Sequence, residues 1–305
     1  MHNKEDTINS YKLMKLSTYV TVCGVFIIII AKSIGWFLTG SVTILASLVD
    51  ALLDIFISIM NLLAVHYAIQ PPDHEHRFGH GKAEDIAVFS ESVFLGLSGI
   101  IVIFTAINRF FSPHNNVLET GNIGVYVLIF SIIITLIIVL IQKYTIKRSN
   151  SKIIEADSLH YFSDLLTNIC AIIGILLTTY YHMPEFDNIV AILISVYIIF
   201  GAIKLFKRSF KNLMDHELDE KDRQMIIDII KKNKDISGFH DFKTRLSGSK
   251  TFVQLHLELD GNMPIKQTHK IAMAIEQDIL AKIPNAEIII HQDPEGVEEE
   301  ISYKD

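Results

Sequence analysis

The sequence predicts an α-helical membrane protein with six transmembrane helices, followed by a small α+β domain. Half of the 305 residues are hydrophobic, and the mean hydropathy is +0.36. Long apolar runs with few charges recur through the first two thirds of the chain, and this pattern stops after Asn212. Such runs are typical of membrane spans. We therefore expect a transport-type membrane domain at residues 1–211 and a separate domain at residues 212–305.

Six apolar windows are long enough to cross a bilayer. They fall at residues 19–38, 41–67, 86–110, 121–142, 159–181 and 186–206. An even number of spans places both termini on one side of the membrane. The termini and the loops of that side carry Lys4, Lys12, Lys15, Arg77, Lys82, Lys143, Lys147, Arg148, Lys152, Lys204, Lys207, Arg208 and Lys211. The opposite loops carry no lysine or arginine, so both termini are expected in the cytoplasm.

The last 94 residues have the pattern of a soluble domain. Asp219 can cap a helix that runs to about Asn233. Residues 239–246 and 251–259 form a predicted hairpin, whose second strand alternates apolar and polar residues. A second helix at residues 262–283 and a third strand at residues 287–291 follow. The resulting order, α-β-β-α-β, predicts a compact ferredoxin-like α+β domain.

Charge and cysteine content exclude several classes of function. Residues 1–211 contain 15 basic and 15 acidic residues, so the net charge of −7 arises entirely after residue 211. An acidic domain argues against nucleic acid and against anionic lipid as its partner. Cys23 and Cys170 both lie inside apolar runs, where we interpret them as packing residues and not as a disulfide or a thiolate metal site.

Two apolar spans contain ionisable residues at helical spacing. Asp50 and Asp54 lie one turn apart in the second span, and His160 and Asp164 lie one turn apart in the fifth. Intramembrane acids are costly and usually functional. Three carboxylates and one imidazole suit a four-coordinate divalent ion of the zinc type. Alternatively, His160 and Asp164 are solvated at the interface or pair with each other, and the two aspartates of the second span share a proton.

The loop between the second and third spans is rich in potential ligands. A turn at Gly79 would bring Asp73, His76 and His80 around one ion. The alternative is a polar, solvated loop. The zinc-protease motif HExxH is absent, because Phe78 follows His74-Glu75 and Glu220 follows His216-Glu217 at the position of its second histidine.

The carboxyl-terminal domain offers a third group of candidate ligands. They are His240, His256, His269, His291 and Asp293. His256 falls on the strand face opposite to Val253, Leu255 and Leu257, so it is not expected in the core. Scattered surface histidines are the alternative interpretation.

Four segments carry a family resemblance. They are Ser47–Asp54, Phe78–Glu84, Ala156–Asp164 and His291–Pro294. With them the sequence resembles the cation diffusion facilitators, close to the bacterial zinc, cadmium and iron efflux type, over nearly the whole chain. The resemblance implies a homodimeric transporter of the bacterial inner membrane, with a metallochaperone-like cytoplasmic domain. It further implies export of a divalent cation, most readily Zn2+, in exchange for protons across the lipid bilayer.

The resemblance also implies roles for individual residues. Asp50, Asp54, His160 and Asp164 match a transport site, and Asp73, His76 and His80 match a loop site. The group of His240, His256, His269, His291 and Asp293 matches a binuclear site at the dimer interface, where Zn2+ would be structural. Lys82 and Asp215 resemble a charge pair between protomers. His160 favours zinc-like ions, with Cd2+ and Fe2+ as alternatives.

Two other classes of function compete with transport. A membrane metalloenzyme would need an open metal position and a separate acid or base, which the four filled ligand positions do not leave. A metal-binding membrane sensor or receptor could use the same carboxyl-terminal sites. It would not need ionisable ligands on two membrane helices. We therefore expect a proton-coupled antiporter that works by alternating access and not an enzyme.

Overall fold

The computed structural model describes residues 2–40, 42–111, 122–181 and 185–296. The chain divides into two compact units, Met1–Phe210 and Lys211–Asp305.

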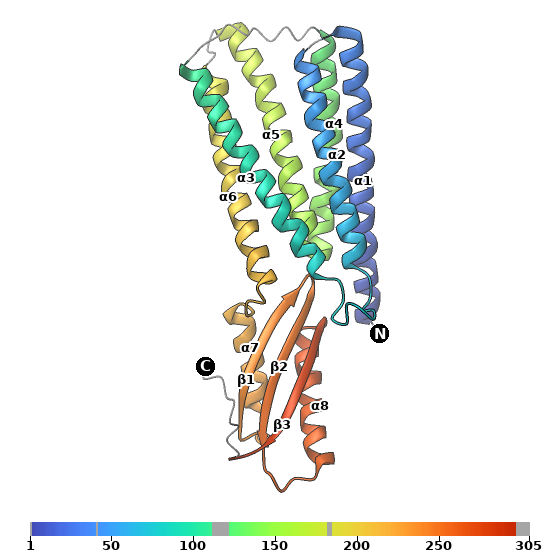
Figure 1. The fold of residues 1–305 in the computed structure, drawn as a ribbon, viewed down its shortest axis with the longest axis vertical. Helices are drawn as coiled ribbons and strands as arrows, with labels where there is room; N and C mark the ends of the chain where they lie inside the picture. The colour runs from blue at the N-terminus through green and yellow to red at the C-terminus, as the bar shows by residue number, and fades with distance from the viewer. Residues whose placement is uncertain (1, 41, 112–121, 182–184, 297–305) are drawn as a thin grey trace. The chain divides into compact units, whose positions relative to one another are not determined.

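The first unit is a bundle of long helices (Figure 1). In chain order they are α1 (His2–Thr39), α2 (Val42–Ala68), α3 (Lys82–Phe111), α4 (Asn122–Ser149), α5 (Lys152–Tyr181) and α6 (Glu185–Leu213). Among the described residues, the helices other than α5 contain windows long and apolar enough to span a membrane. Helices satisfy their own backbone hydrogen bonds, which lipid cannot do. The expected helical membrane domain is therefore confirmed.

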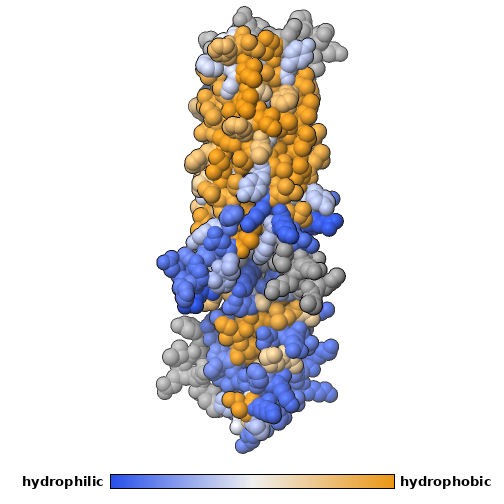
Figure 2. All heavy atoms as spheres, turned by 90° about the vertical axis from the view of Figure 1, so that its right-hand side faces the viewer, coloured by the Kyte–Doolittle hydropathy of each residue, from blue (hydrophilic) through white to orange (hydrophobic). Residues whose placement is uncertain are grey.

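Packing within this bundle leaves much apolar surface outside. Helix α1 packs against α2 and α4, and α4 packs against α5. A cluster that includes Val65, Val88 and Ile154 is fully buried. Large apolar side chains such as Phe37 and Phe104 are exposed instead, and Figure 2 shows one face of the bundle covered almost entirely by hydrophobic residues. An apolar exterior of this extent fits lipid and not water.

The second unit consists of α7 (Glu220–Lys232), β1 (Gly238–Ser247), β2 (Lys250–Leu259), α8 (Ile265–Lys282) and β3 (Ala286–Pro294). Its sheet has the order β1-β2-β3, with β1 antiparallel and β3 parallel to β2. The predicted α-β-β-α-β order is confirmed.

The core of this domain lies between the sheet and its two helices. Leu255 and Leu257 of β2, Ile226 of α7 and Ile275 of α8 are almost completely buried there. The alternation of β2 leaves His256 on the other face, as expected from the sequence. Asp219 is the N-cap residue of α7, but its side chain makes no capping hydrogen bond, and its backbone carbonyl accepts from Asp222 and Arg223.

Candidate metal sites

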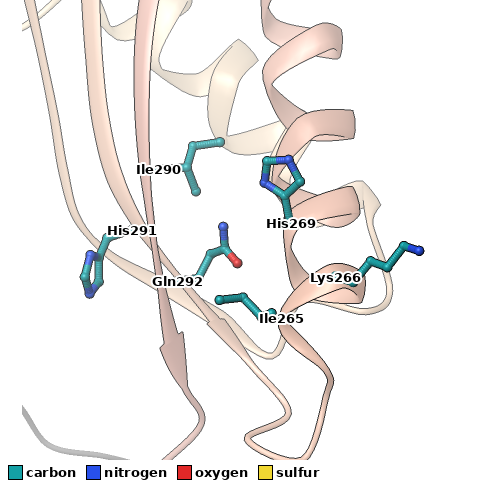
Figure 3. A pocket seen from close by; sticks show the side chains of 6 residues that line it. All are labelled: Ile265, Lys266, His269, Ile290, His291 and Gln292. Atoms are coloured by element: carbon teal, nitrogen blue, oxygen red, sulfur yellow. The ribbon is translucent and has the colours of Figure 1, made fainter.

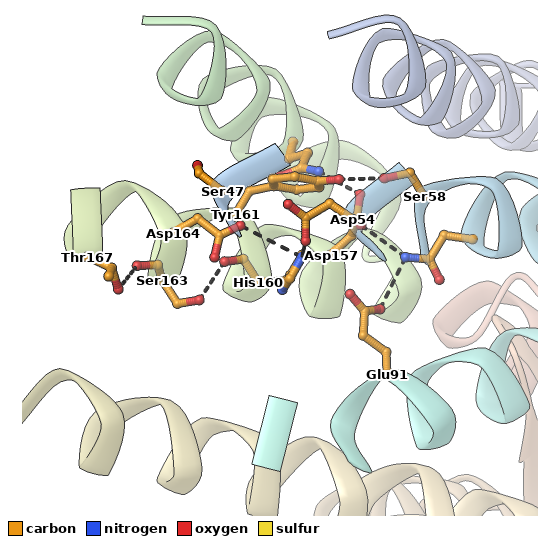
Figure 4. A network of polar contacts seen from close by, with 12 residues as sticks. Ser47, Asp54, Ser58, Glu91, Asp157, His160, Tyr161, Ser163, Asp164 and Thr167 are labelled. Atoms are coloured by element: carbon orange, nitrogen blue, oxygen red, sulfur yellow. Dashed lines mark hydrogen bonds and ion pairs between the residues drawn. The ribbon is translucent and has the colours of Figure 1, made fainter. Parts of the chain in front are cut away.

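The middle of the helical unit brings together residues of α2 and α5. The imidazole Nε2 of His160 lies 3.1 Å from Oδ1 of Asp54 and 3.7 Å from Oδ2 of Asp164. Potential ligand atoms of these three residues all lie within 4.8 Å of one another, and Figure 4 shows them turned towards a common centre. Two carboxylates and one imidazole within this distance can hold a divalent ion of the zinc type.

Asp50 does not join this group. It lies one turn before Asp54 on α2, is exposed, and is absent from the set of ligand atoms within 4.8 Å. It does interact electrostatically with Asp54 and with Lys32. The structure thus gathers three of the four ligands that the sequence suggested, with the fourth on the same face of the same helix.

A buried polar network adjoins the three ligands (Figure 4). The side-chain amide of Asn61 on α2 donates to Asp157 at 2.9 Å and to Glu91 at 3.2 Å. Gln142 on α4 donates to the other carboxylate oxygen of Asp157 at 2.7 Å. All four side chains are almost inaccessible to solvent. The network fixes α5 against α2, α3 and α4 directly beside His160, because buried polar groups of this kind are held by their partners.

A further contact ties α2 to α5 at the same level. The hydroxyl of Tyr161 forms a short hydrogen bond with the hydroxyl of Ser58, and both groups are buried. Ser58 lies one turn after Asp54, and Tyr161 follows His160. This hydrogen bond therefore helps to set the spacing of the two helices where the ligands meet.

The loop between α2 and α3 forms a second cluster. Nε2 of His80 lies 3.3 Å from Oδ2 of Asp73, and Nδ1 of His76 lies 3.5 Å from Oδ1. Gly79 has φ of 84°, a conformation that suits glycine, and its N–H donates to the carbonyl of His76. The backbone N–H of His76, followed by that of Glu75, lowers the pKa of Asp73 below its ordinary value. The turn thus presents an ionised carboxylate to two imidazoles.

The loop cluster is joined to the ends of two helices. The ring of Tyr67, at the end of α2, lies 4.4 Å from the ring of His80 between centroids. Four residues after His80, Oε1 of Glu84 accepts hydrogen bonds at the start of α5, from the hydroxyl of Ser151 at 2.9 Å and from the N–H of Lys152 at 2.7 Å. Glu84 thus caps the N-terminus of α5, where a negative charge is favourable.

The open face of the sheet carries the third cluster. His240 pairs with His256 across β1 and β2, and His256 pairs with His291 across β2 and β3, so the three imidazoles form a row. Oδ2 of Asp293 lies 2.8 Å from Nδ1 of His256 and 3.5 Å from Nε2 of His240, while Oδ1 lies 2.9 Å from Nε2 of His291. Asp293 is therefore the residue around which the three histidines converge. Glu258 supports the row, since its carboxylate lies 2.9 Å from Nδ1 of His240.

His269 lies elsewhere in the domain. It belongs to α8 and lines a pocket together with Ile290, His291 and Gln292 of β3, but the imidazole of His291 is turned away from His269 (Figure 3). A single chain therefore does not bring His269 into the row of histidines.

The suggested charge pair has one partner within its own domain. The carboxylate of Asp215 lies 3.2 Å from Nη1 of Arg245, which belongs to β1. A contact between Lys82 and Asp215 of two protomers stays a prediction.

Sequence reasoning missed several polar residues of these sites. Glu84, Glu91 and Asp157 were not singled out, although each is an acid in or beside an apolar run and is almost fully buried. That placement was the available signal. Glu258 could have been found from its spacing, two residues after His256 on the same strand face.

Comparison with known proteins covers almost the whole chain. The family profile described as a cation efflux transmembrane domain matches residues 18–214, and that described as a cation efflux protein cytoplasmic domain matches residues 218–295. Protein p34 of Rickettsia prowazekii is 45% identical over 298 residues, 97% of each chain. The cation-efflux pump FieF of Serratia proteamaculans is 37% identical over 283 residues, 93% of each chain.

Solved structures also match a part of the chain. The metal-bound C-terminal domain of the CzcD transporter from Thermotoga maritima is 24% identical; it covers 27% of this chain and 100% of its own, with a TM-score of 0.25.

Proposed function

The chain belongs to the cation diffusion facilitator family, and we propose that it exports Zn2+ from the cytoplasm in exchange for protons. Membership makes it an integral membrane transporter of metal cations and not an enzyme. The observation that carries the choice of ion is the cluster of Asp54, His160 and Asp164, formed by two membrane helices. One nitrogen and two oxygens without a thiolate suit Zn2+, with Cd2+ and Fe2+ as related cargoes. The lack of a thiolate also favours release.

Proton coupling follows from the chemistry of the ligands. A metal ion binds the deprotonated forms of imidazole and carboxylate, so binding from the cytoplasm releases protons from the site. After the bundle rearranges and opens outward, protons compete for the same ligands and the metal ion leaves. The inward proton gradient would then drive the cycle by alternating access. Asp50 lies on the correct face of α2 to complete the ligand set when an ion is present.

The other two clusters serve as regulatory or structural sites in this proposal. The row of His240, His256 and His291 around Asp293 would bind metal on the face of the sheet and stabilise a homodimer of the cytoplasmic domain. Metal there can bias transport only by its different affinity for the two states of the transporter. We place the protein in the bacterial inner membrane with both termini in the cytoplasm.

The test is metal flux in proteoliposomes loaded with a zinc-sensitive dye, with internal pH recorded. Zn2+ flux and the opposite proton movement should both disappear in Asp54→Ala. Glu155→Gln is the matched control, because Glu155 is a solvent-exposed acid on α5 that pairs with Arg208. Full flux in Asp54→Ala would overturn the proposal. Metal binding without flux in the unmodified protein would favour the sensor instead.

A further inference from the structure

Lys32 lies on a third helix, α1, and contacts α2, the helix that carries Asp54. It is the only charged residue between Leu16 and Thr39 in the sequence, and it lies half-buried on α1. Its Nζ donates a hydrogen bond to the backbone carbonyl of Ser47 on α2 at 2.9 Å. A lysine inside an apolar span is costly unless it has partners, so a functional role for the Lys32 ammonium is the default hypothesis.

The anchor point lies on the ligand face of α2. Ser47 precedes Asp50 by three residues and Asp54 by seven, which places all three on one side of the helix. From this position the ammonium interacts electrostatically with Asp54 and Asp164, and also with Asp50. Lys32 thus interacts electrostatically with every carboxylate of the expected transport site.

We propose that Lys32 is a positioning and specificity residue, a fixed positive charge that adjusts the transport site to ions of charge two. This inference rests on the proposed function and deepens it. An ammonium has only donors and cannot coordinate a metal ion, so Lys32 acts through the carboxylates that it faces.

The charges support this role. The three carboxylates and the one ammonium together have a net charge of −2. One divalent cation neutralises this charge when His160 is uncharged. A trivalent ion would leave an excess positive charge, which is unfavourable in a partly desolvated site. Repulsion from Lys32 also weakens the hold on a divalent ion, which a carrier needs for release. Without Lys32 the same carboxylates should favour more highly charged ions and should release Zn2+ more slowly.

The experiment compares binding of Tb3+ and Cd2+ to the purified full-length protein. The part of the total metal binding that Asp54→Asn abolishes is assigned to the transport site. Lys32→Met removes the charge and the hydrogen bond, Lys32→Gln removes the charge but keeps a donor for Ser47, and Lys32→Arg keeps the charge. Lys143→Met is the matched control, because Lys143 contacts the ring of Phe162 on α5.

We expect Lys32→Met and Lys32→Gln to raise the affinity for Tb3+ relative to Cd2+ by about tenfold or more, since a trivalent ion is repelled more strongly by a nearby positive charge. In flux assays both variants should lower KM and kcat for Zn2+ together. Lys32→Arg and Lys143→Met should keep the original ratio.

An unchanged ratio of Tb3+ to Cd2+ affinity in Lys32→Met and Lys32→Gln would overturn the proposal. An equal loss of affinity for both ions that Lys32→Arg does not rescue would show a merely structural role and would also overturn it. Binding and flux measured on the unmodified protein distinguish these outcomes from a failure of the proposed function. If it binds both ions but transports none, transport is disproved while the binding ratio still tests Lys32.

Discussion

The imidazole Nε2 of His160 on α5 lies 3.1 Å from the carboxylate Oδ1 of Asp54 on α2, although 106 residues separate the two in the sequence. The hydrogen bond between Ser58 and Tyr161 and the network around Asn61 hold the two helices together beside this contact. The ligands of one site are therefore positioned by two separate sets of buried polar contacts, as is usual for metal sites.

Replacement of His160 by aspartate should change the choice of metal. His160→Asp leaves a site of oxygen ligands only, which suits Mn2+ better than Zn2+. We expect the affinity for Zn2+ relative to Mn2+ to fall by about tenfold or more, measured by competitive binding to the purified protein. His216→Asp, at an exposed position of the other unit, is the control. An unchanged ratio would mean that His160 is not a ligand.

Loss of the glutamate that caps α5 should destabilise the helical unit. Glu84 is 4% exposed and accepts hydrogen bonds from the first residues of α5. Hydrogen bonds to a buried charge contribute about 1.5–3 kcal/mol each, so Glu84→Ala should lower the thermal midpoint in detergent by several degrees. Glu155→Ala should have little effect, because it breaks only an exposed ion pair with Arg208. Equal midpoints for the two variants would contradict the capping role.

Truncation of a core residue should unfold the cytoplasmic domain more easily. Leu257 is completely buried between the sheet and its helices. Leu257→Ala in a fragment of residues 211–305 should cost about 2–5 kcal/mol of unfolding free energy in urea denaturation. Ile265→Ala should cost less than about 0.5 kcal/mol, because Ile265 is 84% exposed. A similar cost for both would disprove the described core.

Zinc should stabilise the same fragment through the row of histidines. Ligand at about one hundred times its dissociation constant adds about 2.7 kcal/mol to stability. We therefore expect Zn2+ to raise the thermal midpoint of residues 211–305. His256→Ala should lose this increase, because His256 lies at the centre of the row and contacts Asp293. His216→Ala should retain it, and an increase that survives in His256→Ala would argue for another site.

The pKa of Asp241 should depend on a neighbouring lysine. A hydrogen bond from Lys243, at 2.9 Å, lowers the pKa of Asp241 below its ordinary value. Because the folded-state pKa lies below the unfolded one, the stability that this pair contributes is present above the ordinary pKa. It is lost as the pH falls through the lowered value. Lys243→Met should raise the pKa of Asp241, measured by carboxyl NMR titration, and no change would contradict the assignment.

Patterns in the sequence are enough to predict the classes of structure and the identity of most candidate ligands. Long apolar runs predict membrane helices, since a bilayer admits little else, and strict alternation in residues 251–259 predicts a half-buried strand. Helical spacing placed Asp50 with Asp54 and His160 with Asp164 on common faces, because that spacing is a property of the local backbone.

The packing of the folded chain settles which faces meet. It brought Asp54 to His160 and Asp164 but left Asp50 outside, and it placed His269 on the helix side of the sheet, away from the row around Asp293. It also connected Glu84 to the start of α5, and Lys32 to Ser47 beside the carboxylates. These contacts join residues far apart in the chain, and they depend on how whole helices and strands pack. Local spacing carries no information about such packing, so no pattern within one segment could have predicted them.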